Sequence, residues 1–421
     1  MSRYLPGADP SATEPRPRPD AWIAERYGDE SAPAAVVPPL RWALPICAAH
    51  LRDRQPAMHR LDPAVRVAAL ARVARSWMDS VDPLRQEALE RVPAEAGLSP
   101  ESIAWGLDRA FEVLTADALR EWGPPPVDPV ALSGHVWAGN VITAGLPPVI
   151  GSLLAGVPAL IKAPGDLPAF AELFAQSLAQ HAPELGDCLG AAAWSRDDAA
   201  ATDALLSSVD RLYVFGNDAS IDALRQRAEV PVAGFGHRLS VAVVGEDATD
   251  DELTGLLVDS LAWDGGGCLT PTWAFVLGDA DAVGRRLAAL APSVSASLPP
   301  VPGDLAGGAA RANLLGVAGA LGFAASGAGW AVVAMPALNL VEVPPRTVCL
   351  LPADLPAVTA AIESLGPVLQ GVATAGTADL TPVRGRLDAL GLSLVAPAGR
   401  LQTPPLDWNH DGVDVLGVLQ R

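Results

Sequence analysis

Residues 211–228 read RLYVFGNDASIDALRQRA, and this stretch decides the fold class. An apolar run typical of a buried strand ends at Phe215, Gly216 makes a turn, and a polar helical pattern follows. This order of strand, turn and helix is the unit from which parallel sheets are built, because parallel strands need a crossover connection. The stretch therefore predicts an α/β fold if the same order recurs along the chain.

The order does recur, and it forms two series. The first series has expected strands at 131–136, 159–162, 190–193 and 211–215, and expected helices at 146–154, 168–181, 197–207 and 220–228. The second series has expected strands at 240–244, 273–277, 347–351 and 368–373, and expected helices at 250–262, 280–290, 355–364 and 379–390. The sequence thus predicts two Rossmann-like domains, each built on a parallel sheet.

The part of the chain before these series is expected to be helical. Asp62-Pro63 and Ser99-Pro100 each place a capping residue before a proline, which is a signal for a helix start. The two series meet near Gly234 to Gly236, where we place a domain boundary. The expected organisation is a flexible arm rich in Pro and Ala at 1–40, a first domain with N-terminal helices at 41–236, a second domain at 237–395 and a C-terminal segment at 396–421.

Composition excludes several classes of function. The 48 acidic residues outnumber the 29 basic ones and give a net charge of −19, so nucleic acids and anionic lipid surfaces are not expected as partners. The uncharged runs 141–161 and 313–341 are interrupted by Pro and Gly, which favours short buried elements over membrane spans. No signal segment opens the chain, and the expected location is the cytoplasm. The four cysteines and six histidines are scattered, so neither a metal site nor a disulfide framework is expected.

The most informative motif for chemistry is WDGGGCLTP at residues 263–271. Three glycines allow the backbone before Cys268 to approach a ligand closely. A cysteine presented on such a loop can attack a carbonyl or thioester carbon. Cys268 is therefore a candidate nucleophile, whereas Cys47, Cys188 and Cys349 are expected to be buried apolar side chains.

Further candidates lie at the carboxyl ends of expected strands, where ligands of open parallel sheets bind. Asn140 follows Gly139 and could aim an amide donor into a cleft, or could simply belong to a turn. Lys162 could bind a ribose or a phosphate, or could reach solvent. Gly216 and Asn217 open a helix whose N-terminus favours phosphate, although Asn217 could equally cap that helix.

Taken together, these segments resemble the long-chain acyl-CoA reductases of the LuxC type (bioluminescence fatty acid reductases), a branch of the aldehyde dehydrogenase superfamily. The resemblance covers roughly residue 131 to the C-terminus, and its specific part is the order of six motifs. They are Gly139-Asn140-Val141, a strand ending in Lys162, Phe215 to Asp218, Gly236 to Arg238, Gly267 to Pro271, and Gly399-Arg400 with Trp408 to Gly412.

The resemblance implies an aldehyde-dehydrogenase-like fold and NAD(P)H-dependent reduction of an acyl-CoA to an aldehyde. It implies that Cys268 is the nucleophile that takes the acyl group as a thioester. Asn140 and the backbone N–H of Cys268 would form the oxyanion hole. Lys162 would hold the adenosine ribose of the cofactor, and Gly216 with Asn217 would face its pyrophosphate. The first domain would then bind the cofactor and the second would carry the catalytic cysteine.

Two departures from the wider superfamily refine these expectations. Aldehyde-oxidising relatives carry a glutamate before the glycines that open the second domain, whereas residues 232–236 read VAGFG here. Because that glutamate activates water for thioester hydrolysis, its absence favours reduction, or acyl exchange with a thiol, over oxidation. Gly165 stands where an acidic residue often follows the ribose lysine, which leaves room for a 2′-phosphate and favours NADPH over NADH. The neighbouring Asp166 weighs against this preference.

Other functions stay open from the sequence alone. The chain could reduce acyl groups carried on the phosphopantetheine arm of a carrier protein, or it could be a non-catalytic scaffold of the same fold. The expected partners are an acyl-CoA or acyl-carrier-protein substrate, an acyl-transferase or synthetase, and further copies of the chain in a homo-oligomer. The run 313–341 could line an acyl tunnel, but core packing explains it better. Composition assigns no role to the segment with Trp408, His410 and Asp411.

Overall fold

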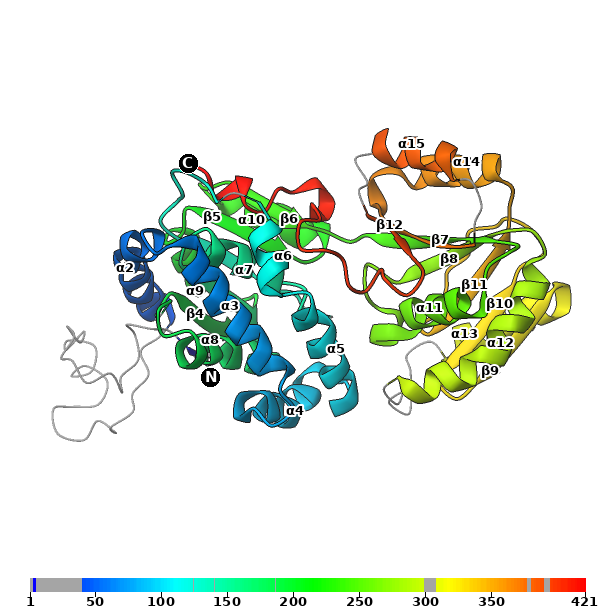
Figure 1. Ribbon diagram of the computed structural model, residues 1–421, viewed down its shortest axis with the longest axis horizontal. Helices are drawn as coiled ribbons and strands as arrows, with labels where there is room; N and C mark the ends of the chain where they lie inside the picture. The colour runs from blue at the N-terminus through cyan, green and yellow to red at the C-terminus, as the bar shows by residue number, and fades with distance from the viewer. Residues whose placement is uncertain are drawn as a thin grey trace.

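The computed structural model describes residues 3–4, 40–123, 125–139, 141–185, 187–298, 308–376, 380–389 and 394–421. Its described strands form two sheets that lie side by side, with helices packed on their faces (Figure 1). Most of the arm expected at 1–40 falls outside the described residues. Within it, Arg3–Tyr4 forms the short strand β1, and Leu40 begins a helix.

The first sheet has the described strand order β1-β4-β3-β2-β5-β6. Its strands after β1 pair in parallel, whereas β1 runs antiparallel to β4. The chain builds β2, β3 and β4 outward in one direction and then returns to add β5 and β6 on the other side of β2. The order therefore reverses between β2 and β5, which is where open parallel sheets bind ligands. The bounds are β2 Ser133–Val136, β3 Ala159–Pro164, β4 Leu189–Trp194, β5 Arg211–Phe215 and β6 Val232–Phe235.

The second sheet has the described order β13-β12-β7-β8-β11-β10-β9. Its neighbouring strands pair in parallel except at the hairpin between β9 and β10. The bounds are β7 Leu239–Gly245, β8 Pro271–Leu277, β9 Phe323–Gly327, β10 Trp330–Ala334, β11 Thr347–Pro352, β12 Leu369–Ala375 and β13 Leu394–Pro397.

Helices surround both sheets. Those of the first part are α2 Leu40–His59, α3 Pro63–Met78, α4 Pro83–Ala96, α5 Pro100–Glu112, α6 Ala116–Glu121, α7 Leu146–Leu154, α8 Ala169–His181, α9 Ala199–Leu206 and α10 Asp218–Arg227. Those of the second part are α11 Asp250–Leu261, α12 Ala280–Ser297, α13 Gly308–Leu321, α14 Leu355–Leu365 and α15 Thr381–Ala389. The 3₁₀ segments are η1 Ala262–Gly265, η2 Gly366–Val368, η3 His410–Gly412 and η4 Gly417–Leu419.

Local sequence explains where several N-terminal helices begin. The Asp62 carboxylate accepts a hydrogen bond from the backbone N–H of Ala64, and the Ser99 hydroxyl accepts one from Ser102. Proline occupies the first position of both helices, where its missing N–H costs no hydrogen bond. The helix starts expected at 62–63 and at 99–100 are confirmed.

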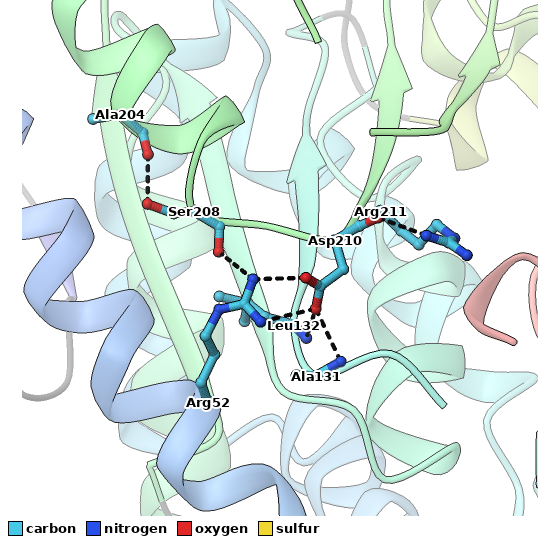
Figure 2. A network of polar contacts seen from close by, with 7 residues as sticks. All are labelled: Arg52, Ala131, Leu132, Ala204, Ser208, Asp210 and Arg211. Carbon is cyan, nitrogen blue, oxygen red and sulfur yellow. Dashed lines mark hydrogen bonds and ion pairs between the residues drawn. The ribbon is translucent and has the colours of Figure 1, made fainter. Parts of the chain in front are cut away.

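A polar network fixes α2 on the amino-terminal edge of the first sheet (Figure 2). The Arg52 guanidinium donates to both carboxylate oxygens of Asp210, at 3.0 and 2.7 Å. Asp210 also accepts the backbone N–H groups of Ala131 and Leu132, each at 2.9 Å. Burial favours a raised pKa for Asp210, but Arg52 and these two N–H groups outweigh it and lower that pKa. One carboxylate thus joins α2 to the segments that lead into β2 and β5.

The expected fold class is confirmed, because two parallel α/β sheets follow an N-terminal helical region. The sequence did not indicate α2, which contains Pro45 and Pro56, or the hairpin of β9 and β10 within the run 313–341. Both are stabilised by tertiary contacts: α2 packs against α9, and the hairpin packs under α12 and α13. Among the helices of the described ranges, none is both long and apolar enough to cross a bilayer.

Candidate active site at the junction of the two sheets

The site forms where the two sheets meet. The chain passes directly from β6 through residues 236–238 into β7. The carboxyl end of the first sheet therefore faces the amino end of the second (Figure 1). Cys268 lies just before β8, in the second sheet, and the Ser240 hydroxyl of β7 donates a 2.9 Å hydrogen bond to its backbone carbonyl. The candidate nucleophile is thus held at the junction by the strands that begin there.

The loop before Cys268 has an unusual backbone. Trp263 adopts a φ of 51°, which residues other than glycine seldom adopt, and Gly265 adopts a φ of 75°. A side chain at Gly265 would come within 2.9 Å of the Arg346 backbone nitrogen. The Trp263 ring packs edge-on against Trp105 and leaves no space for a side chain at Gly106. Helix α5 therefore fixes the loop that presents the thiol.

Cys268 lines a cavity that is open to solvent on one side. Its walls come from α5, from the start of α7, from the end of β6, from the loop 263–269 and from the C-terminal segment. Most of the surface is apolar. The lining residues are Gly106, Arg109, Ala110, Val113, Leu114, Trp122, Val141, Thr143, Ala144, Leu146, Pro147, Pro148, Phe235, Trp263, Gly267, Cys268, Leu269, Gln402, Thr403, Pro404, Pro405, Leu406, Trp408, His410 and Val415. No described residue of the run 313–341 is among them, so that run does not line this cavity.

The C-terminal segment bridges the two sheets and closes one side of the cavity (Figure 1, red). At the second sheet, the backbone N–H of Gly399 donates to the fully buried Asp259 carboxylate of α11 at 2.6 Å. Burial raises the pKa of Asp259 to about 6, and the backbone N–H groups of Gly399, Leu401 and Gln402 oppose this rise. At the first sheet, the Tyr213 hydroxyl of β5 donates to the Val415 carbonyl at 2.7 Å. The segment is thus held at both ends.

The Cys268 thiol is protonated at neutral pH in this arrangement. Burial raises its pKa to about 11, and the Asp411 carboxylate acts in the same direction. The backbone N–H groups of Cys268 and Leu269 and the Arg238 guanidinium act in the opposite direction. The thiol must therefore lose its proton during the reaction, because the thiolate is the reactive form.

Asp411 and His410 reach the site from the C-terminal segment. Asp411 accepts the backbone N–H of Gly236 at 3.3 Å and lies 3.4 Å from the Nε of Arg238. Burial raises the pKa of Asp411, and Arg238 opposes that rise. The His410 ring stacks on Trp408 at a centroid distance of 4.8 Å. Burial and Arg238 lower the pKa of His410 to about 3, so its ring is neutral.

The expected cofactor residues lie at the carboxyl edge of the first sheet. Lys162 lies in β3, with its Nζ 5.7 Å from the Trp194 ring centroid. Burial lowers the pKa of Lys162, with Asp166 opposing. Gly216 follows β5, and a Cβ at this position would have its nearest neighbour 3.7 Å away.

The remaining two expected site residues have different outcomes. The Asn217 side chain caps α10 by accepting the Ser220 N–H at 2.8 Å, so this amide oxygen already has a donor. Asn140 lies outside the described residues. Its neighbour Val141 lines the cavity beside Cys268.

The sequence missed most of the cavity wall. Val113, Trp122 and Val415 carry no local motif, and they meet only because the helices and the C-terminal segment fold onto the junction. The one available signal was the density of aromatic and titratable residues around Trp408 and His410.

Comparison with known proteins supports the fold. A putative aldehyde dehydrogenase, PutA, from Anabaena variabilis is similar over 93% of both chains, with a TM-score of 0.64 and 15% identity. Aldehyde dehydrogenase 21 from Physcomitrella patens, solved with the product succinate, is similar over 89% of this chain and 84% of its own, with a TM-score of 0.65 and 14% identity.

A third solved structure is an NADP-dependent glyceraldehyde-3-phosphate dehydrogenase from Bacillus halodurans, in complex with NADP. It is similar over 85% of this chain and 83% of its own, with a TM-score of 0.62 and 14% identity. Comparison with curated protein sequences gave no match. The sequence profile of the acyl-CoA reductase (LuxC) family matches residues 67–421, and the chain therefore belongs to the acyl-CoA reductase (LuxC) family.

Proposed function

We propose that this protein reduces an acyl thioester, with acyl-CoA as the expected substrate, to an aldehyde through an acyl group held on Cys268. The observation that carries the proposal is the position of Cys268 in the wall of a mainly apolar cavity at the junction of the sheets. Such a cavity suits a hydrocarbon chain, since burying apolar surface is favourable by about 25 cal/mol per Å². Membership of the acyl-CoA reductase (LuxC) family supports an oxidoreductase that converts an acyl group to an aldehyde.

The first step is transfer of the acyl group. The Cys268 sulfur attacks the thioester carbonyl carbon, and the thiol of the substrate leaves. Negative charge then develops on the carbonyl oxygen, where the backbone N–H of Cys268 and the Asn140 amide would stabilise it. Each donor of this kind contributes about 3–4 kcal/mol to lowering the barrier. The acyl chain would extend between α5 and the C-terminal segment.

The second step is reduction of the acyl group. When bound, a reduced nicotinamide would supply the hydride that converts the acyl group on Cys268 to the aldehyde and frees the cysteine. Two described carboxylates lie at the β6–β7 connection. Asp411 accepts the Gly236 N–H and lies 3.4 Å from the Arg238 Nε, and Asp218 lies 3.7 Å from the Arg238 Nη1. Because the Arg238 guanidinium pairs with both, each is a poor base for activating water, which supports reduction over oxidation to a free acid.

The proposed cofactor is NADPH, with NADH as the alternative. Lys162 and the N-terminus of α10 after Gly216 would hold the ribose and the pyrophosphate at the edge where ligands of such sheets bind. A Cβ at Gly165 would come within 3.0 Å of the Ser195 backbone nitrogen, so a carboxylate side chain is disfavoured there. With glycine at residue 165, a 2′-phosphate would meet no carboxylate from this position.

The test is incubation of the protein with a panel of acyl-CoAs and NADPH, followed by mass detection of acyl adducts on Cys268 and of aldehyde. The proposal predicts both products, and it predicts that the Cys349→Ala variant behaves like the native protein because Cys349 is buried elsewhere. Aldehyde only from acyl groups on a carrier protein would move the substrate to that class. Free acid from an aldehyde and NADP, or no adduct with any thioester, would contradict the proposal.

A further inference from the structure

His410 shares the cavity with the candidate nucleophile and is the only imidazole among its described lining residues. It comes from the C-terminal segment, which also forms one wall of the cavity. The His410 side chain is 21% exposed, so the ring is neither sealed in the core nor free in solvent. A ring in this position is accessible to groups that bind in the cavity.

Neighbouring side chains hold the His410 ring in one orientation. The ring stacks nearly parallel on Trp408, with an interplanar angle of 16°, and packs against Phe235 at a centroid distance of 4.8 Å. Phe235 stacks in turn on Phe215 at 4.4 Å. This aromatic column ties the ring to the ends of β5 and β6, and therefore to the junction at which Cys268 lies.

The surroundings of His410 keep the ring neutral, so an imidazolium that forms there gives up its proton readily. At neutral pH the ring is uncharged, so one of its two nitrogens can accept a proton. The Asp411 carboxylate lies 3.9 Å from its Nε2, and the Trp408 face lies against the ring, so both stabilise an imidazolium when one forms. Arg238 disfavours the imidazolium and keeps it from persisting.

We propose that His410 carries the proton of Cys268 during acyl transfer. The inference rests on the proposed function. As the bond between Sγ and the carbonyl carbon forms, the thiol proton moves to the imidazole. As the bond between that carbon and the departing sulfur breaks, the imidazolium returns the proton to the departing sulfur. Acyl transfer then consumes and releases no net proton.

Other polar groups beside the cavity suit this role less well. Both oxygens of Asp411 already have partners in Gly236 and Arg238. Arg238 is a permanent cation with no acceptor. Arg109, which also lines the cavity, is likewise a cation and pairs with Glu112 at 2.8 Å.

The test compares two octanoyl thioesters in the first step alone, without cofactor. One is octanoyl-CoA, whose thiol needs a proton to leave. The other is the octanoyl thioester of nitrothiobenzoate, whose acidic thiol leaves without one. Acylation of Cys268 is followed by quenching and mass measurement. His410→Gln is expected to slow acylation by octanoyl-CoA about 100-fold. The ratio of the octanoyl-CoA rate to the nitrothiobenzoate rate is expected to fall at least roughly 10-fold.

His237→Gln is the matched control. His237 is exposed, lies in the β6–β7 connection close to the site, and is absent from the cavity wall. It should leave the ratio unchanged. An unchanged ratio in His410→Gln, or the same fall in His237→Gln, overturns the role of His410. If His410→Gln does not fold, His410→Asn is measured by the same ratio and decides in the same way. Failure of the native protein to form any adduct would instead remove the proposed function.

Discussion

The Asp411 carboxylate lies 3.4 Å from the Nε of Arg238, and these two side chains act on the Cys268 thiol with opposite sign. Asp411 belongs to the C-terminal segment and Arg238 to the connection between the sheets. Burial has the largest effect on the pKa of the thiol, and these two charges, one from the C-terminal segment and one from the connection between the sheets, modify it.

Removing either charge should change the pH dependence of Cys268 alkylation. Asp411 raises the pKa of the thiol, so Asp411→Asn should lower it and speed reaction with iodoacetamide between pH 8 and 10. Arg238 lowers the pKa, so Arg238→Gln should slow the reaction. At a pH below the pKa, lowering the pKa by one raises the thiolate fraction roughly tenfold. Asp407→Asn, an exposed change in the same segment, should leave the profile in place. Identical profiles in all three variants would contradict this electrostatic account.

Loss of the Asn140 amide should slow the chemistry without affecting thiol reactivity. Asn140→Ala is expected to reduce kcat about 100- to 1000-fold, because one donor to the developing oxyanion is gone. The rate of Cys268 alkylation should stay within a factor of two, since iodoacetamide creates no oxyanion. A variant with native kcat would remove Asn140 from the oxyanion hole.

Filling the cavity should select against long acyl chains. Ala110 of α5 lines the cavity, and Ala110→Phe would occupy part of the space available to the chain. We expect kcat/KM for dodecanoyl-CoA to fall at least roughly tenfold relative to acetyl-CoA, since each buried CH₂ contributes about 0.8 kcal/mol. Ala320→Phe, an exposed change on α13 in the run 313–341, should leave this ratio unchanged. If only Ala320→Phe changes the ratio, the acyl chain lies elsewhere.

Asp210 should stabilise the fold in a pH-dependent manner. Its pKa is lowered in the folded protein, so its stabilising effect is present above the ordinary aspartate pKa and is lost as the pH falls through the folded value. Asp210→Ala is expected to cost about 1–3 kcal/mol at pH 7, mainly through the unpaired N–H groups of Ala131 and Leu132. The ion pair with Arg52 is about a third exposed and adds little. Urea unfolding of both proteins at pH 7 and pH 3 should show the difference shrink at the lower pH.

Much of the sheet architecture could be predicted from sequence. Strands such as β3, β5 and β8 are mostly apolar runs bounded by Gly, Pro or capping residues, and these local signals predict the strands without tertiary information. Helix α2 could not be predicted in this way, because Pro45 and Pro56 oppose a helix locally while packing against α9 stabilises it. The strand β9 is rich in Ala and Gly, and its pairing with β10 is a tertiary effect.

The sequence predicted only part of the candidate site. Cys268 has a local signature in its three glycines, and its place at the junction agrees with that signature. The sequence left two roles open for Asn217, and the structure shows that its side chain caps α10. The parts played by Asp259, Asp411 and His410 depend on contacts between segments far apart in the chain, which no local pattern encodes.

The most direct test of the account is aldehyde production by Cys268→Ala with an acyl-CoA and NADPH, measured beside Cys349→Ala. The account predicts that Cys268→Ala forms neither aldehyde nor an acyl adduct above background, whereas Cys349→Ala retains both. Continued aldehyde production by Cys268→Ala would contradict it.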